Sequence, residues 1–143
     1  MNGEKLVKTI RVVSCGAKYG APPEGADLLI DCRGFINPHY DEALRPLTGA
    51  DKKVRDFLEA DPQVTALRDS LSGMLAALLP GYLTRSAYHK EKDVLLVFMC
   101  TGGKHRSRYF TIEAARISQD LVASHPEWGA VQVVIEHRES VET

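Results

Sequence analysis

The chain has 143 residues, with 18 Lys and Arg against 19 Asp and Glu, giving a formal net charge of −1 at pH 7. A chain of this length is expected to fold as a single domain, residues 1–143, around one sizeable core. The balanced charge excludes a general electrostatic attraction to nucleic acid, so any polyanion must bind to a local group of cations. The three cysteines lack metal-ligand spacing, and the sequence shows no signal peptide and no membrane-spanning apolar run. We therefore predict a cytoplasmic protein with reduced thiols and without a metal or cofactor.

Two strands are predicted in the first third of the chain. Leu6 to Cys15 is rich in β-branched residues, and Ala26 to Arg33 has an apolar centre. Glycines and prolines between them predict a loop. Because open α/β sheets bind ligands beyond the carboxyl ends of their strands, Asp31 and Arg33 are candidate ligand-binding residues. The alternative for these two side chains is a surface ion pair.

A long loop follows the second strand, over residues 34–49. Loops of this length without periodic structure are uncommon in compact domains and are often functional. The loop carries polar side chains suited to holding a polar ligand, namely Asn37, His39, Tyr40 and Arg45. The alternative is an ordered surface loop held by its prolines.

Two helices are predicted in the middle of the chain. The first begins near Asp51, and the second runs from about Pro62 to Leu79, where a Pro-Gly pair ends it. Apolar residues at helical spacing predict that Met74 and the leucines of the second helix belong to the core. Arg85 to Asp93 is expected to be a solvated loop, and no role is predicted for His89 within it.

The most informative stretch is a buried strand from Val94 that breaks at a pair of glycines and is followed by a helix over Ser107 to Leu121. Lys104, His105 and Arg106 fall where the helix begins. Backbone amides, the positive end of the helix dipole and up to three cationic side chains would converge there, which predicts an anion site, with phosphate as the ligand. An unliganded turn is the alternative. The stretch does not match a Walker A loop, which requires a different glycine spacing and Ser or Thr after the Lys.

The same stretch contains a second pattern, in which Cys100 is followed by five residues and then by Arg106 and Ser107. This constellation is that of cysteine-dependent phosphatases, where the loop lowers the pKa of the Cys and holds the phosphoryl group. In that reading Cys100 is the nucleophile and Asp31 protonates the leaving oxygen. A Cys that closes a buried strand is more often a small core residue. We therefore assign no catalytic residue and keep the phosphatase as the alternative function.

Val131 to Arg138 predicts a closing strand that places His137 and Arg138 at its end. The order of elements predicts a layered α/β domain with a central, partly parallel sheet flanked by helices. The carboxyl ends of the strands would then gather most of the predicted cations, with Arg45 joining from the long loop: Arg33, Arg45, Lys104, His105, Arg106 and Arg138.

Several segments together resemble the C-terminal domain of the RapZ family of bacterial RNase adapter proteins. In chain order they are Ala17–Gly20, Asp31–Arg33, Asn37–His39, Leu44–Gly49, Cys100–Ser107 and His137–Arg138. The resemblance covers nearly the whole chain. It implies a compact α/β domain likened to the sugar-phosphate-binding part of phosphofructokinase. It also implies binding of glucosamine-6-phosphate, binding of small regulatory RNAs and self-association of the parent protein as a homo-oligomer. As a binding module, the domain is expected to act through a protein or RNA partner.

Carried over residue by residue, the resemblance implies a phosphate cradle made of Thr101, Gly102, Gly103, Lys104, His105, Arg106 and Ser107. It implies that Asp31, Arg33, His39 and Arg138 line the sugar end, with His137 beside Arg138. The family is a binder and regulator, which favours the anion site over the phosphatase. The sequence departs from the pattern of this family in two respects that are expected to affect its function. The P-loop domain of the family is absent from this chain, and the sequence ends with the acidic residues 139–143, where RNA-binding relatives can carry a basic run, which counts against RNA binding.

Overall fold

Four strands form one sheet in the order β2-β3-β1-β4, and every neighbouring pair is parallel. The computed structural model describes residues 7–138. The strands are β1 (Lys8–Gly16), β2 (Leu28–Asp31), β3 (Val94–Cys100) and β4 (Val131–Arg138). The layered α/β fold predicted from the sequence is confirmed, and the sheet is parallel throughout. The predicted strand start at Leu6 and the acidic end of the chain lie outside the described residues.

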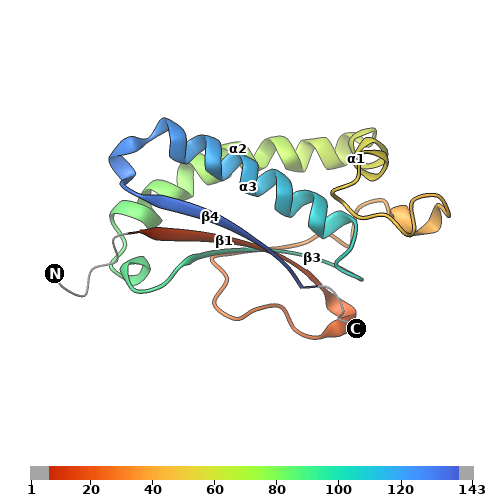
Figure 1. Ribbon diagram of the computed structural model, residues 1–143, viewed down its shortest axis with the longest axis horizontal. Coiled ribbons are helices and arrows are strands. Elements are labelled where there is room, and N and C mark those ends of the chain that lie inside the picture. Colours follow the sequence, from red (N-terminus) through yellow and green to blue (C-terminus); the bar gives the residue numbers. More distant parts are fainter. Residues whose placement is uncertain (1–6, 139–143) are drawn as a thin grey trace.

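Three helices cover the same face of this sheet (Figure 1). They are α1 (Lys52–Glu59), α2 (Pro62–Thr84) and α3 (Arg106–Ser124), and short 3-10 turns lie between the larger elements at η1 (Ala17–Tyr19), η2 (Pro38–Tyr40), η3 (Tyr88–Lys90) and η4 (Pro126–Trp128). The main core lies between the helices and the sheet, with Leu96 and Phe98 of β3 packed against Phe110 of α3 and the leucines of α2. Within residues 7–138, no helix is both long and apolar enough to cross a membrane.

The opposite face of the sheet is covered by the loop between β1 and β2 rather than by a helix (Figure 1). From β1 the chain moves to β2 on one side, whereas from β2 to β3 and from β3 to β4 it moves toward the other side. Crossovers between parallel strands are right-handed, so a reversal of direction requires the connection to pass over the other face. Ala26 of this loop packs on a second, smaller cluster that includes Val13, Leu95 and Val97.

Helix α2 is longer than the sequence indicates, because it continues through Pro80 to Thr84. The continuation is explained by Leu83, which is 4% exposed and extends the buried row formed by Leu71, Leu75 and Leu79. The prediction that Met74 is a core residue is wrong, since its side chain is 37% exposed. The buried row follows a spacing of four residues, and Met74 lies beside that row rather than on it.

His89 has a structural role that the sequence does not reveal, and the loop around it is not simply solvated. Its Nε2 lies 2.8 Å from Asp27 Oδ1, and its ring stacks on Tyr82 with the centroids 4.4 Å apart. Asp27 also accepts hydrogen bonds from Lys92 Nζ at 3.0 Å and from the Leu95 amide at 2.9 Å. One buried carboxylate therefore ties the segment before β2 to the segment before β3.

The pKa of Asp27 is lowered by these contacts. Burial alone would raise it, but the hydrogen bonds from Leu95, Lys92 and His89 lower it below the usual value. A carboxyl group with a depressed pKa in the folded state stabilises the fold above its unfolded pKa of about 3.9. That stabilisation is lost as the pH falls through the folded-state value.

We predict that Asp27→Asn lowers the free energy of unfolding at pH 7 by about 2 kcal/mol, because it removes a charged acceptor from three donors. The difference from the wild type should shrink below about pH 4, as the wild-type carboxyl becomes protonated. Urea unfolding followed by circular dichroism from pH 3 to pH 7 measures both effects. Asp120→Asn, at an exposed position on α3, is the matched control and should change stability little at any pH. If Asp27→Asn lowered the free energy of unfolding by the same amount at every pH in this range, the stabilising role of the ionised Asp27 carboxylate would be contradicted.

Candidate anion-binding site

The loops that follow β1 and β3 meet at the point where the sheet reverses its winding. These two strands are neighbours, but the chain leaves β1 toward β2 and leaves β3 toward β4, on opposite sides. In open α/β sheets such a reversal leaves a crevice beyond the carboxyl ends of the two strands, and ligands bind there. The glycine loop singled out in the sequence, residues 101–105, borders this crevice.

Glycines allow the two loops to pack backbone against backbone. A Cβ atom on Gly16 would lie 2.6 Å from the carbonyl carbon of Gly102, and one on Gly103 would lie 2.8 Å from the Gly16 amide nitrogen. Gly103 also has a φ of 72°, in the left-handed region that favours glycine. The Lys18 amide then donates to the Thr101 carbonyl oxygen at 3.1 Å, which fixes η1 beside the glycine loop.

The long loop after β2 docks on the same region. The Gly49 amide donates to the Lys104 carbonyl oxygen at 2.9 Å, and a Cβ atom on Gly49 would overlap the His105 carbonyl oxygen. Nε2 of His105 lies 3.1 Å from the Leu44 carbonyl oxygen, where it serves as the donor. Loop 34–49 is therefore attached to the start of α3 and forms a wall of the crevice.

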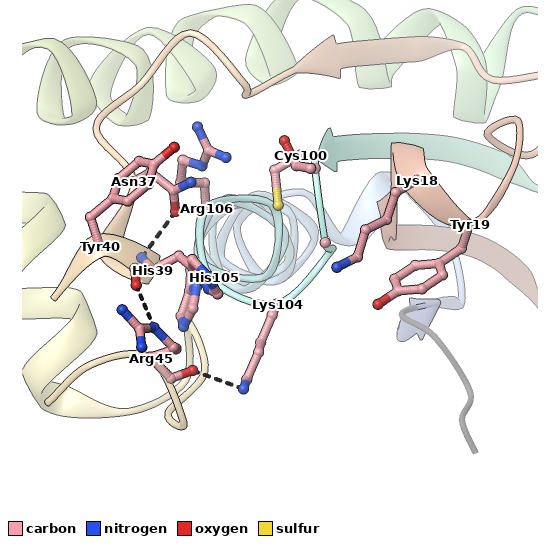
Figure 2. Close-up of a pocket in the computed structure, with 12 residues that line it drawn as sticks. Lys18, Tyr19, Asn37, His39, Tyr40, Arg45, Cys100, Lys104, His105 and Arg106 are labelled. Atoms are coloured by element: carbon pink, nitrogen blue, oxygen red, sulfur yellow. Dashed lines mark hydrogen bonds between the residues drawn. The ribbon is translucent and has the colours of Figure 1, made fainter. Parts of the chain in front are cut away.

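The crevice is a cavity of about 400 Å³. Figure 2 views α3 from its first turn, with Lys18 and Tyr19 on one wall and Asn37, His39 and Tyr40 on the other. The lining residues come from the loops that follow β1, β2 and β3, from the last residue of β3 and from the first residue of α3. They are Lys18, Tyr19, Asn37, His39, Tyr40, Arg45, Cys100, Thr101, Gly102, Lys104, His105 and Arg106.

Among the described residues, the lining includes four Lys or Arg side chains and no carboxylate. The four are Lys18, Arg45, Lys104 and Arg106, and none of them forms a salt bridge with a carboxylate of residues 7–138. Lys104 Nζ instead donates to the Arg45 carbonyl oxygen at 2.9 Å, and Arg45 Nε donates to the His39 carbonyl oxygen at 2.9 Å. Without a carboxylate at ion-pair distance in residues 7–138, these four positive charges favour an anion in the cavity.

Arg106 combines a structural role with an unused donor. Its side chain is buried, with the residue only 4% exposed, and Nη1 donates to the carbonyl oxygens of Arg33 and Phe35, each at 3.0 Å. Its Nε is also buried and has no acceptor within the described part of the chain. Because a buried guanidinium donor without an acceptor is costly, this atom favours an anionic ligand nearby.

The first turn of α3 supplies further donors. The amides of a helix's first turn have no carbonyl partner within the helix, and the dipole makes this end positive. His105 is the N-cap residue and makes no side-chain hydrogen bond to the turn. Burial lowers the pKa of His105, so this imidazole is neutral at pH 7. Of the three cations expected in a row, Lys104 and Arg106 carry charge and His105 contributes a neutral ring.

The structure brings together most, but not all, of the residues predicted from the sequence. Those that line the cavity are Asn37, His39, Tyr40, Arg45, Thr101, Gly102, Lys104, His105 and Arg106, together with Cys100. Their role in binding stays a prediction. Gly103 and Ser107 do not line the cavity, since Gly103 packs against the backbone of Gly16 and Ser107 Oγ lies 3.1 Å from Cys100 Sγ. The four residues predicted at strand ends do not line the cavity: Asp31, Arg33, His137 and Arg138.

These four side chains are occupied by other contacts. Arg33 binds Asp31 through its amide at 3.0 Å, through Nε and through Nη2 at 2.7 Å, so the alternative of a surface ion pair describes both residues. Arg138 reaches Glu136 at 3.4 Å, and His137 Nδ1 lies 2.6 Å from Ser14 Oγ. The ends of parallel strands share one edge of the sheet, but successive side chains point to opposite faces. A residue at a strand end can therefore lie at this edge without facing the cavity.

Nothing in the cavity supports the phosphatase alternative. Cys100 is 2% exposed, and its Sγ lies 3.1 Å from Ser107 Oγ in a buried hydrogen bond. Asp31, the predicted proton donor, is held by hydrogen bonds from Arg33 that lower its pKa. A lowered pKa keeps this carboxyl ionised at neutral pH, which is the wrong state for protonating a leaving group.

Lys18 and Tyr19 are lining residues that the sequence analysis did not assign to the site. They lie in η1, directly after β1, where the chain turns between Gly16 and Gly20. The available signal was the glycine-flanked loop after the first strand, but its proximity to the glycine loop after β3 follows only from the pairing of β1 with β3.

The fold and the cavity define a one-sided α/β domain with a cationic pocket at the switch point of a parallel sheet. The model of the RapZ C-terminal domain family matches residues 8–141. The chain belongs to this family.

Relatives extend well beyond the region that this chain covers. The chain is 38% identical over 128 residues to a nucleotide-binding protein of Acidothermus cellulolyticus, covering 90% of this chain and 39% of the relative. It is 41% identical over 123 residues to the nucleotide-binding protein HEAR2885 of Herminiimonas arsenicoxydans, with 83% and 41% covered. It is 47% identical over 106 residues to the nucleotide-binding protein Francci3_1634 of Frankia casuarinae, with 74% and 34% covered. The chain thus spans about 40% or less of the length of these curated relatives.

We predict that Gly103→Ala lowers the free energy of unfolding by about 2–4 kcal/mol, from left-handed backbone strain and from overlap with Gly16. Gly73→Ala is the matched control, because Gly73 lies within α2 with open space around it, and this change should stabilise the fold by about 0.5–1 kcal/mol. Chemical denaturation of the two variants measures the contrast. Equal midpoints for Gly103→Ala and the wild type would show that the close approach is not a constraint.

Proposed function

We propose that this domain binds a phosphosugar, with the phosphate at the first turn of α3, and that it serves as a regulatory binding domain. The observation that carries the proposal is a cavity lining in which residues 7–138 contribute four Lys or Arg side chains and no carboxylate. The protein as a whole has a net charge of −1, so this concentration of positive charge is local. The cavity volume of about 400 Å³ falls within the range of small-molecule sites.

In this proposal the phosphate accepts hydrogen bonds from the backbone amides at the start of α3. Arg106 Nε and Lys104 Nζ supply charge-assisted donors beside them. The sugar hydroxyls then face the wall formed by Asn37, His39 and Tyr40, which presents amide, imidazole and phenol groups. Asn37 is held in place, since its Oδ1 accepts a hydrogen bond from the His39 amide at 3.0 Å.

Glucosamine-6-phosphate is the specific ligand that the family resemblance implies, and it is the first probe to use. A regulatory domain acts through a partner. The same resemblance implies small RNAs and further copies of the chain as candidates, and a protein partner is the other candidate. No observation favours hydrolysis of the bound ester, so turnover is not part of the proposal.

We predict that the wild-type protein binds glucosamine-6-phosphate or glucose-6-phosphate more tightly than inorganic phosphate. Lys104→Gln should weaken this binding about tenfold, the effect of losing one charge-assisted contact of about 1.4 kcal/mol. Isothermal titration calorimetry at low ionic strength measures both effects. Lys53→Gln, which removes the same charge from an exposed position of α1 outside the cavity, is the matched control and should bind as the wild type does. If no phosphosugar bound at millimolar concentration, the proposed function would be wrong.

A further inference from the structure

Two of the three cysteines lie side by side where β2 and β3 end. In the parallel register of these strands Asp31 lies opposite Met99, and the Cys32 amide continues the ladder by donating to the Met99 carbonyl oxygen at 2.6 Å. The residue beside Cys32 is therefore Cys100. Neighbouring strands lie about 4.7–4.9 Å apart, and the Cα atoms of a disulfide are usually about 4.4–6.8 Å apart. The backbone thus places the two cysteines at bridging distance.

The side chains of Cys32 and Cys100 point to the same face of the sheet. Both belong to the core between the sheet and the helices, and they are 0% and 2% exposed. Cys15, at the end of β1, lies in the small cluster on the opposite face. Two cysteines whose Cβ atoms point apart cannot be bridged without movement of the backbone, so Cys15 is excluded as a partner of Cys100. All three thiols are free in the structure, which is therefore the reduced form.

The two neighbouring thiols differ in their access to a small reactant. Cys100 lines the cavity, and its Sγ lies 3.1 Å from Ser107 Oγ. Cys32 is not among the lining residues, and burial raises the pKa of its thiol. Because the thiolate is the reactive form of cysteine, Cys32 does not begin a reaction with an oxidant. Cys100 is the thiol that an oxidant in the cavity meets first, and Cys32 is the neighbour that can resolve the product.

The same two positions are joined to the backbone of the anion site. Cys100 directly precedes the glycine loop, which begins at Thr101. Cys32 directly precedes Arg33, whose carbonyl oxygen accepts a hydrogen bond from Arg106 Nη1 at 3.0 Å. A disulfide has its own preferred Cα separation, most often about 5.5–6 Å, and a fixed torsion about the S–S bond. A bridge between these residues would therefore move the carbonyl oxygen that holds Arg106 and the start of the glycine loop.

We propose that Cys32 and Cys100 form a reversible disulfide when a hydroperoxide enters the cavity, and that this disulfide weakens anion binding. The Cys100 thiol gives up its proton and attacks the terminal peroxide oxygen. The O–O bond breaks, Cys100 becomes a sulfenic acid, and the remaining oxygen leaves as water or an alcohol with the released proton. The Cys32 sulfur then displaces the hydroxyl group from Cys100, and this group leaves as water with the Cys32 proton. The two sulfurs together lose two electrons, and the peroxide gains them.

The effect on anion binding rests on the proposed function, whereas the formation of the bridge does not. A small dithiol returns the protein to the reduced form by thiol–disulfide exchange. The oxidation state of the pair would then set the affinity of the cavity for its ligand.

Peroxide treatment of the purified protein tests the bridge. The protein is exposed to hydrogen peroxide, quenched with catalase, alkylated under denaturing conditions and mapped by mass spectrometry without reductant. We expect the loss of two of the three thiols and a peptide pair that joins Cys32 to Cys100 within one chain. Dithiothreitol should restore all three thiols.

Single substitutions assign the roles of the three cysteines. Cys32→Val keeps a buried apolar residue of similar volume, and its oxidation should stop at the sulfenic or sulfinic acid of Cys100. Cys100→Ser should leave both other thiols reduced, because neither of them lines the cavity. Cys15→Ser changes a cysteine on the opposite face, so it is the matched control and should form the bridge as the wild type does.

Calorimetry of the reduced and the oxidised protein tests the effect on binding, with inorganic phosphate and glucosamine-6-phosphate as the probes. Oxidation should raise Kd by about tenfold, the effect of losing one charge-assisted contact of Arg106. Dithiothreitol should return Kd to the value of the untreated protein. Circular dichroism should show the same fold in both forms.

The outcomes separate this inference from the proposed function. If peroxide leaves all thiols intact, stops at an oxidised Cys100 in the wild type or produces a bridge that includes Cys15, the inference is overturned and the proposed function stands. If the bridge forms but Kd is unchanged, or if the oxidised protein unfolds, the disulfide does not regulate the site. If the reduced protein binds no phosphate ester, the proposed function fails and the regulatory effect fails with it, whereas a mapped bridge still stands.

Discussion

The site depends on one close approach of two backbones, between Gly16 at the end of β1 and Gly102 and Gly103 after β3. A side chain on Gly16 or Gly103 would separate the loops, and the left-handed φ of Gly103 sets the direction in which the chain enters α3. The approach occurs where the sheet reverses its winding, so the loops that it joins have no crossover between them. The floor of the cavity, the wall carrying Lys18 and the first turn of α3 all follow from this contact.

Around that contact, the domain separates two kinds of charged side chain. Outside the cavity, several cations form ion pairs: Arg33 with Asp31, Arg11 with Glu136, and Arg55 with the buried Glu113, which joins α1 to α3. Inside it, the contacts of these cations within residues 7–138 are with backbone carbonyl oxygens or with the ring of Tyr19, so that their charge is available to a ligand. The net charge near zero therefore hides an uneven distribution, because positive side chains gather at the cavity while others form ion pairs elsewhere.

The one-sided cover of the sheet also has a simple cause. Right-handed crossovers place α1, α2 and α3 over one face, and the single reversal sends the loop after β1 over the other. On that face the loop packs through Ala26 on the small cluster that includes Val13, Leu95 and Val97. The buried carboxylate of Asp27 then anchors this loop at the end of the sheet remote from the cavity, through His89 and Lys92. The protein is thus held at one end by glycine backbones and at the other by a buried ionic group.

The sequence by itself determined the local elements and the loop that matters most. The apolar run from Val94, the two glycines and the periodic helix after them identified strand, turn and helix start, because these signals depend only on neighbours in the chain. Tertiary structure decided which other residues join that loop. Asp31 and Arg33 were predicted at the site because they end a strand, yet they pair with each other, whereas Lys18 and Tyr19 line the cavity because β1 pairs with β3. The order of the strands, the burial that keeps His105 neutral and the contact of His89 with Asp27 depend on segments that are distant in the chain. Local sequence patterns do not predict such contacts.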